Sequence, residues 1–241
     1  MQAEQHTCKS TAERNKAELE DFWGIFNGTT TYVDKDFTAD SSSLYWTDMD
    51  ESNQGWGELE WKRASDEFKD HSLFGSEGVT PADVRQGSIG DCWFLSAISA
   101  LSEVPGRIER VFQDQDNELS PNGVYAINFW TLGVPHTVIV DDFLPMQLRH
   151  DGNYYSVFTK MGLDDAIWAP ILEKAFAKYH GNYSHIVGGD SRLAARTLSG
   201  APYDTYGHTD YSKADIIQQL SHRDSNDELI QVNTGGNNNA Y

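Results

Sequence analysis

The chain has 241 residues, of which 39% are hydrophobic and 23% charged, and its formal net charge is −19. This length and apolar content predict one large globular domain, or one domain with flanking pieces. The negative charge argues against nucleic-acid binding, because proteins neutralise phosphates with Lys and Arg. An acidic, soluble surface is the simpler interpretation of the charge, and binding of hard cations such as calcium is the other.

Two cysteines and the hydropathy pattern bear on where the protein works. Cys8 lies in a polar stretch and Cys92 in an apolar, helix-like one, so a disulfide framework is not expected. Residues 1–19 contain no apolar signal core, and no apolar run approaches the ~20 residues that cross a bilayer. We therefore expect a soluble protein of the reducing cytoplasm without a membrane span.

The first quarter of the chain is predicted to be largely irregular. Residues 1–10 are typical of a disordered tail, and residues 11–26 form a short helix whose apolar side chains recur at spacings of three and four. Residues 29–58 are loop-like but rich in aromatic side chains, which favours an arm pinned to a globular body. The alternation over residues 59–63 predicts a short strand.

Stronger signals follow from Thr80 onward. Thr80 and Pro81 are typical of a helix start and predict a short helical turn, and residues 91–103 predict a buried helix. Residues 124–130 and 136–140 predict an antiparallel hairpin.

The next two residues, Asp141 and Asp142, would end that hairpin. They are interpreted either as caps of neighbouring backbone N–H groups or as a cation site, and capping is favoured.

Helical patterns dominate the rest of the chain. Residues 169–180 predict a helix that begins near Pro170 and is capped by Gly181. Residues 214–221 predict a further helix, and residues 228–232 predict a strand. Because helices and strands are segregated along the chain, the fold class is α+β.

The chemistry centres on Cys92. The preceding Gly87 and Gly90 and the apolar run after it place Cys92 in the first turn of a buried helix, where free N–H groups and the helix dipole favour a thiolate. The Gln86 amide and the Cys92 backbone N–H would form an oxyanion hole, and Gly90 would let a substrate backbone approach. A lone cysteine is more often an inert buried residue. The complete string from Gln86 to Trp93 instead favours the activated thiol of a cysteine-protease-type site.

Residues 86–101 closely resemble the active-site segment of calpains, which are calcium-dependent cysteine endopeptidases. Further segments resemble the family in the same order: 32–37, 61–63, 138–145, 167–178 and 183–189. The resemblance covers roughly residues 30 to 220. It implies the cysteine-bearing first half of a papain-like protease core, with a central buried helix, flanking helices and a small antiparallel sheet. It assigns Cys92 as the nucleophile and Gln86 as the oxyanion donor.

The resemblance also implies a domain division. Residues 1–28 would form a tail and short helix, residues 29–210 the cysteine-bearing subdomain, and residues 211–241 the start of the second protease subdomain. The family's catalytic histidine and asparagine motifs, Gly-His-x-Tyr and Asn-Pro-Trp-Gly, do not occur in the chain. We expect them beyond Tyr241, and we interpret the eight histidines present as surface or capping residues.

Calcium is the cofactor that the resemblance implies. The family's ligand positions match the carbonyl groups of Ser76 and Gly78 and the carboxylate of Asp83. The remaining family carboxylate is Ala166 here, so Asp165, or its neighbour Asp164, is expected to replace it. A family arginine that helps couple calcium binding to closure of the two subdomains is replaced by Pro81.

The resemblance predicts a calcium-dependent cysteine-type endopeptidase that cleaves intracellular proteins through a Cys-His-Asn mechanism. This chain would supply only the Cys and the Gln and would be inactive alone. Its partners would be protein substrates and the second protease subdomain. A non-proteolytic calpain-like binding or regulatory module is the alternative; the absent histidine favours it, and the retained Cys92 and Gln86 do not. A transglutaminase-type acyltransferase shares the Gly-x-Cys-Trp pattern but not the residues around it.

Overall fold

The computed structural model describes residues 16–17, 19–20, 22–47, 56, 58–113 and 115–232. Contacts divide the chain into two compact units, Met1–Ala201 and Pro202–Tyr241. The predicted tail, residues 1–10, lies outside the described residues. The expected subdomain boundary near residue 210 stays a prediction.

The N-terminal part of the first unit is attached through aromatic side chains. Residues 22–26 of the predicted N-terminal helix are helical, and Phe22 is buried in a cluster with Val124 and Ala126. The arm that follows contains the short helix α2 (Ser41–Leu44). Trp56 stacks on Tyr45 and packs edge-on against Phe158, with ring centroids 5.1 and 4.7 Å away. These contacts confirm the prediction of an arm pinned by aromatics.

A long hairpin forms one part of the scaffold. Strands β2 (Val124–Thr131) and β3 (Val134–Asp141) pair antiparallel, from Val124 opposite Asp141 to Thr131 opposite Val134. The two turn residues, Leu132 and Gly133, both have positive φ angles, as two-residue hairpin turns require. The predicted hairpin is confirmed.

A second, three-stranded sheet has the order β1-β4-β5, with all pairs antiparallel. It consists of β1 (Glu60–Arg63), β4 (Phe143–Leu148) and β5 (Tyr154–Ser156). The sequence predicted β1 but not β4 or β5. Asp141 ends β3, yet the chain bends there and enters β4 only two residues later.

The acid pair at this bend caps backbone groups, as the favoured interpretation had it. Asp141 accepts hydrogen bonds from the N–H groups of Asp34 (2.8 Å) and Phe143 (3.0 Å). Asp142 accepts one from the N–H of Ser65 at 3.0 Å.

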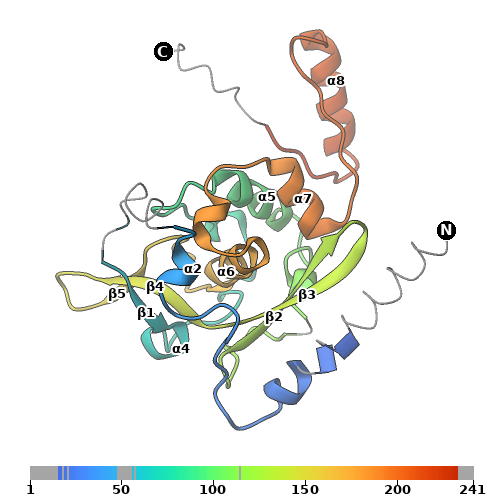
Figure 1. The fold of residues 1–241 in the computed structure, drawn as a ribbon. Coiled ribbons are helices and arrows are strands. Elements are labelled where there is room, and N and C mark those ends of the chain that lie inside the picture. Colours follow the sequence, from blue (N-terminus) through green and yellow to red (C-terminus); the bar gives the residue numbers. More distant parts are fainter. Residues whose placement is uncertain are drawn as a thin grey trace. The chain divides into compact units, whose positions relative to one another are not determined.

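Two buried helices lie in the interior of the first unit. Helices α5 (Cys92–Ser102) and α6 (Trp168–His180) agree with the predicted helices to within about a residue at each end. Helix α6 contacts β2, β3 and β4, and Figure 1 shows it at the centre of the first unit. The stacked rings of Phe94 and Phe176, 4.1 Å between centroids, join α5 to α6. Burial of ten consecutive residues, Trp168 to Ala177, makes α6 the core of this unit.

Helix α7 (Ser191–Ser199) was not predicted. It begins at an Asp190 cap and ends at Gly200 in the left-handed region, and its buried face packs on α5 and β2. Short elements complete the first unit: α4 (Ala64–Glu67), η1 (Pro81–Asp83), η2 (Glu109–Val111) and η3 (Tyr183–Ile186).

The second unit contains α8 (Lys213–Asp224), which confirms the predicted third helix. None of the residues of α8 is buried. The predicted strand at residues 228–232 is wrong: this stretch is irregular, and the Glu228 carboxylate pairs with Arg223 of α8. A strand-like sequence forms a strand only where a partner strand is available, and the described part of this unit offers none.

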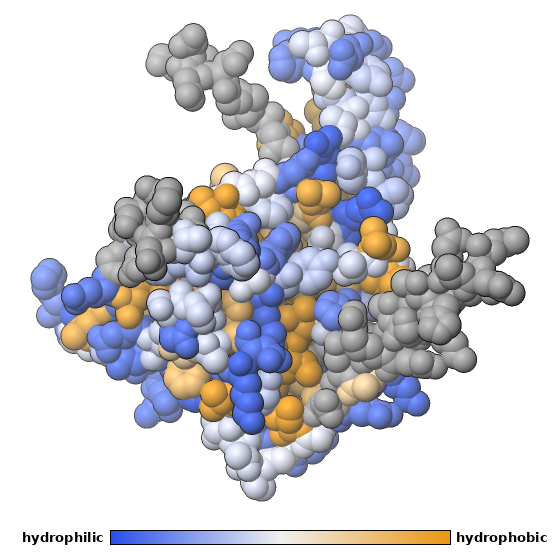
Figure 2. All heavy atoms as spheres, viewed as in Figure 1, coloured by the Kyte–Doolittle hydropathy of each residue, from blue (hydrophilic) through white to orange (hydrophobic). Residues whose placement is uncertain are grey.

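Mixed helices and small antiparallel sheets confirm the α+β class. On the face drawn in Figure 2, hydrophilic residues cover much of the surface between separate hydrophobic patches. Within the described residues, every helix is too short or too polar to cross a membrane.

Candidate active site

The loop from η1 to α5 is held against the chain segment that follows β5. The N–H of Ser88 donates to the carbonyl oxygen of Val157 at 2.9 Å. A Cβ atom on Gly87 would lie only 1.6 Å from the carbonyl oxygen of Phe158. Only glycine therefore allows this approach, which fixes the position of the neighbouring Gln86.

The Gln86 side-chain amide is anchored at the start of α5. Its Nε2 donates to the carbonyl oxygen of Ile89 and, at 3.0 Å, to Oδ1 of Asp91. Because both partners are acceptors, the NH₂ group must point toward them. Gln86 is thus tied to the residue that immediately precedes Cys92.

Cys92 is the first residue of α5, and its side chain is exposed and free. No described residue forms a hydrogen bond with its thiol. The next three residues of α5 are buried, so the thiol sits at the open N-terminal end of a core helix, where the dipole favours a thiolate. The exposure rules out the interpretation of Cys92 as an inert buried cysteine.

Trp93, in contrast to Cys92, is buried in the interior. Only 8% of Trp93 is exposed, and its Nε1 donates to the carbonyl oxygen of Ile186 at 2.8 Å. A Cβ on Gly189 would lie 2.3 Å from the indole, so glycine is needed beneath the ring. Trp93 therefore anchors the first turn of α5 and orients Cys92 toward solvent.

Two acidic side chains meet behind Cys92. Asp91 is fully buried, and burial raises its pKa to about 6. Glu173 of α6 is also fully buried; burial first, and then the charge of Asp91, raises its pKa well above the usual range. Sequence reasoning missed Glu173, although a carboxylate flanked by the apolar residues of a predicted helix was an available signal.

The residues predicted as calcium ligands come together only in part. Asp83 is buried and accepts hydrogen bonds from the Thr80 N–H (2.9 Å) and the Trp168 Nε1–H (3.1 Å). Burial raises the Asp83 pKa, and the nearby carboxyl group of Asp164 raises it further. The loop that contains Ser76 lies against Asp164, since the Ser76 N–H donates to the Asp164 carbonyl oxygen at 3.3 Å.

Asp165 and Ala166 lie differently. Asp165 has a φ of +68°, and its carboxylate faces His71, with Oδ1 3.5 Å from Nε2. Ala166 is buried against Gly162. Among the described residues no group of three or more His, Cys, Asp and Glu side chains could hold a metal. Oxygen atoms that could bind a cation are nevertheless present. Oδ1 of Asp164 is buried and accepts no hydrogen bond from a described residue, and the Asp83 carboxyl group lies next to it.

Residues 32–240 match the family model of the calpain family cysteine proteases. The chain belongs to this family. The family assignment confirms the resemblance found in the sequence and identifies the fold as the calpain protease core.

Individual calpains agree with this assignment. The chain is 35% identical to Calpain-5 of Caenorhabditis elegans over 179 residues, which are 72% of this chain and 26% of that protein. It is 34% identical to Calpain-type cysteine protease ADL1 of Oryza sativa subsp. japonica over 181 residues, which are 73% of this chain and 8% of that protein. Calpain-8 of Rattus norvegicus is 32% identical over 181 residues, which are 75% of this chain and 25% of that protein. The chain thus spans about a quarter or less of the length of these calpains.

A calpain-type nucleophile requires a base, and the described histidines have other partners in the structure. His180 packs on Phe176, with centroids 4.5 Å apart, and burial lowers its pKa. Nδ1 of His185 lies 2.8 Å from the carbonyl oxygen of His180. His71 faces Asp165 instead of the thiol. No described histidine is hydrogen-bonded to Cys92.

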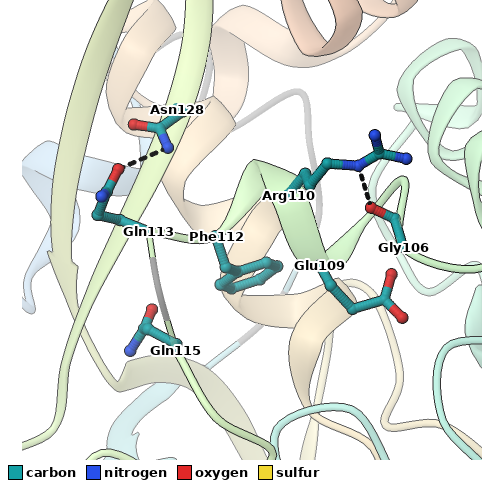
Figure 3. A pocket seen from close by; sticks show the side chains of 7 residues that line it. All are labelled: Gly106, Glu109, Arg110, Phe112, Gln113, Gln115 and Asn128. Carbon is teal, nitrogen blue, oxygen red and sulfur yellow. Dashed lines mark hydrogen bonds between the residues drawn. The ribbon is translucent and has the colours of Figure 1, made fainter.

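A pocket of about 460 Å³ lies apart from this calpain-type site. Figure 3 shows its lining residues: Gly106, Glu109, Arg110, Phe112, Gln113, Gln115 and Asn128. Some of the lining residues are hydrogen-bonded to one another; for example, Nδ2 of Asn128 donates to Oε1 of Gln113 at 2.9 Å. Neither Gln86 nor Cys92 lines it, so the candidate active site is the exposed start of α5 and not this pocket.

Proposed function

We propose that this chain supplies the nucleophile and one oxyanion donor of a calcium-dependent, calpain-type cysteine endopeptidase. The Cys92 thiolate would attack the scissile carbonyl carbon and form a carbon–sulfur bond. A histidine of a second subdomain, beyond residue 241, would protonate the departing amine as the carbon–nitrogen bond breaks. Water would then hydrolyse the thioester. The substrates would be proteins of the cytoplasm, a compartment in which a free thiol such as Cys92 stays reduced.

The exposed thiol at the N-terminus of α5 is the observation that supports this proposal. As the first residue of the helix, Cys92 has a backbone N–H without an intrahelical acceptor. That N–H and the anchored Gln86 amide supply the two donors that an oxyanion needs.

The proposal predicts that residues 1–241 alone do not hydrolyse casein, with or without calcium, because the base is absent. A longer chain that includes the second subdomain should cleave casein, and Cys92→Ser should lower its kcat by about 10⁴-fold or more. Robust cleavage by residues 1–241 that is abolished by Cys92→Ser would instead require an internal base. Longer chains that never cleave any protein would favour a non-proteolytic module.

We further propose that calcium binds between Asp83 and Asp164, with carbonyl oxygens of Ser76 and Gly78. Hard oxygen donors are the ligands that calcium prefers. A divalent cation would relieve the repulsion between the two adjoining carboxylates and engage the buried Oδ1 of Asp164.

Neighbouring aspartates provide a matched test of this calcium site. Calcium should raise the thermal midpoint of the wild type and of Asp165→Asn, whose carboxylate faces His71. It should leave the midpoint of Asp164→Asn nearly unchanged, because one ligand charge is lost. An undiminished calcium shift in Asp164→Asn, or a lost shift in Asp165→Asn, would place the ion elsewhere.

A further inference from the structure

Two buried carboxyl groups interact behind Cys92. Asp91 and Glu173 lie within hydrogen-bond reach of each other, and both are fully buried. Oδ2 of Asp91 is buried and receives no hydrogen bond from a described donor. Two carboxylates at this separation repel strongly where water is excluded.

The partners of Glu173 indicate where a proton would lie. Both carboxyl oxygens of Glu173 accept from the Thr159 N–H at 3.1 Å, and Oε1 also accepts from the Thr159 hydroxyl at 2.5 Å. Oδ1 of Asp91 accepts from Gln86. One proton on Glu173, donated to Oδ2 of Asp91, would satisfy the remaining buried acceptor and remove the repulsion.

We propose that Asp91 and Glu173 share one buried proton, and that this acid pair is the device that positions the Gln86 amide for oxyanion stabilisation. The positioning role rests on the proposed protease function, whereas the shared proton does not. Asp91 and Glu173 act through Gln86 and are positioning residues.

The two hydrogen bonds of the Gln86 amide differ in strength. The bond to the Asp91 carboxylate is charge-assisted, whereas the bond to the Ile89 carbonyl joins neutral groups. When substrate binds, the N–H directed at Ile89 is the one released to the oxyanion, and Asp91 holds the amide in place. Asp91 can hold the Gln86 amide in this way when Asp91 is ionised and Glu173 is neutral.

No nearby cation in the described part of the chain pairs with Asp91 or Glu173 and so takes the place of the shared proton. Lys160 interacts electrostatically with Glu173, but its Nζ donates to the carbonyl oxygens of Ser156 (3.1 Å) and Val157 (3.3 Å). The Tyr183 hydroxyl is buried near the acid pair, and burial first and the adjoining acid pair second raise its pKa well above the usual range, so it stays neutral. The raised pKa values of both acids agree with a retained proton.

Infrared spectroscopy of residues 1–241 tests the shared proton directly. The wild type should show the carbonyl stretch of a protonated carboxyl group at pH 7, and Glu173→Gln should lack it. The introduced glutamine keeps the shape of the side chain and can donate to Asp91, so the fold should persist. Asp151→Asn, which alters an exposed carboxylate with a lowered pKa, should leave the band in place. Absence of the band in folded wild type would overturn the proposal.

Amide NMR tests the link to Gln86. The side-chain NH₂ resonances of Gln86, assigned with Gln86→Ala, should shift with a midpoint near the Asp91 pKa of about 6. In Glu173→Gln that midpoint should stay nearly unchanged, because the introduced amide donates to the ionised form of Asp91 as the protonated Glu173 does. A midpoint that moves to much lower pH would contradict the shared proton, since it would show that Glu173 carries a negative charge beside Asp91 in the wild type.

Kinetics of the full-length protein test the positioning role. Asp91→Asn should lower kcat by about tenfold, less than complete loss of an oxyanion donor, with little change in KM. Wild-type kcat in a folded Asp91→Asn protein would overturn the positioning role. An inactive full-length wild type that retains the infrared band would refute the protease proposal and, with it, the positioning role, and would leave the shared proton standing.

Discussion

At the scale of single residues, two glycines of the same loop have different reasons to be glycine. Gly87 lies against the backbone of Phe158, whereas a Cβ on Gly90 would meet nothing closer than Cγ1 of Val187 at 3.5 Å. The fold therefore requires Gly87 but not Gly90. An open surface at Gly90, beside the exposed Cys92, is what an approaching substrate backbone needs.

This difference predicts unequal effects of the same substitution. Gly87→Ala should lower the free energy of unfolding by about 1–3 kcal/mol, because the loop must move away from a rigid carbonyl group. Gly90→Ala should change it by less than about 0.5 kcal/mol. Urea unfolding of the two variants measures both values, and equal destabilisation would show that the loop is not held as described.

Residues of the site differed in how far the sequence could identify them. Cys92 and Gln86 were found because their chemistry and spacing are local. Glu173 was missed because its contact with Asp91 joins positions far apart in the chain, and only the packing of α5 on α6 creates it. Asp164 and Asp165 could not be told apart in the sequence, because the positive φ of Asp165 and the contact of its carboxylate with His71 are visible only in the structure.

At the scale of elements, α6 is joined to the strands by buried charge. Nζ of Lys174 is fully buried, pairs with Asp141 and donates to the carbonyl oxygen of Phe143 at 2.7 Å. One turn later, Nζ of Lys178 lies 2.7 Å from Oδ2 of Asp34, and this lysine side chain is 19% exposed. The helix thus presents two similar ion pairs with unequal access to water.

Loss of the buried ion pair of Lys174 should destabilise the protein more than loss of the ion pair of Lys178. Lys174→Met should lower the free energy of unfolding by about 3–5 kcal/mol, because it leaves the carboxylate of Asp141 buried without its counter-ion. Lys178→Met should cost less, since the Lys178 side chain is partly exposed and water already screens its ion pair with Asp34. Thermal and urea unfolding compare the two, and a smaller loss in Lys174→Met would contradict this account of how α6 is held.

Elements with an internal signal were predicted well, and those that depend on a neighbour were not. Helix α6 and the β2–β3 hairpin have clear periodicity and turn residues of their own. Strand β5 has only three residues and exists because β4 lies beside it. Residues 228–232 illustrate the converse, since a strand-like pattern without a partner stays irregular.

At the scale of the whole molecule, the helices of the two units differ in how much they bury. Helix α6 buries ten consecutive residues, whereas α8 buries none, and its Ile217 and Leu220 are 53% and 37% exposed. Helices of this length gain most of their stability from packing an apolar face. The second unit, as described, gives α8 no such surface.

If residues beyond 241 complete a second protease subdomain, they should cover the apolar side chains of α8. Hydrogen exchange should then be fast for α8 amides in residues 1–241 and at least about 100-fold slower in the longer protein, because burial ties opening of the helix to unfolding of its subdomain. Amides of α6 should be equally protected in both chains and serve as the internal control. Unprotected α8 amides in a longer chain that cleaves casein would show that the histidine-bearing part folds without this helix, and would separate the second unit from the catalytic core.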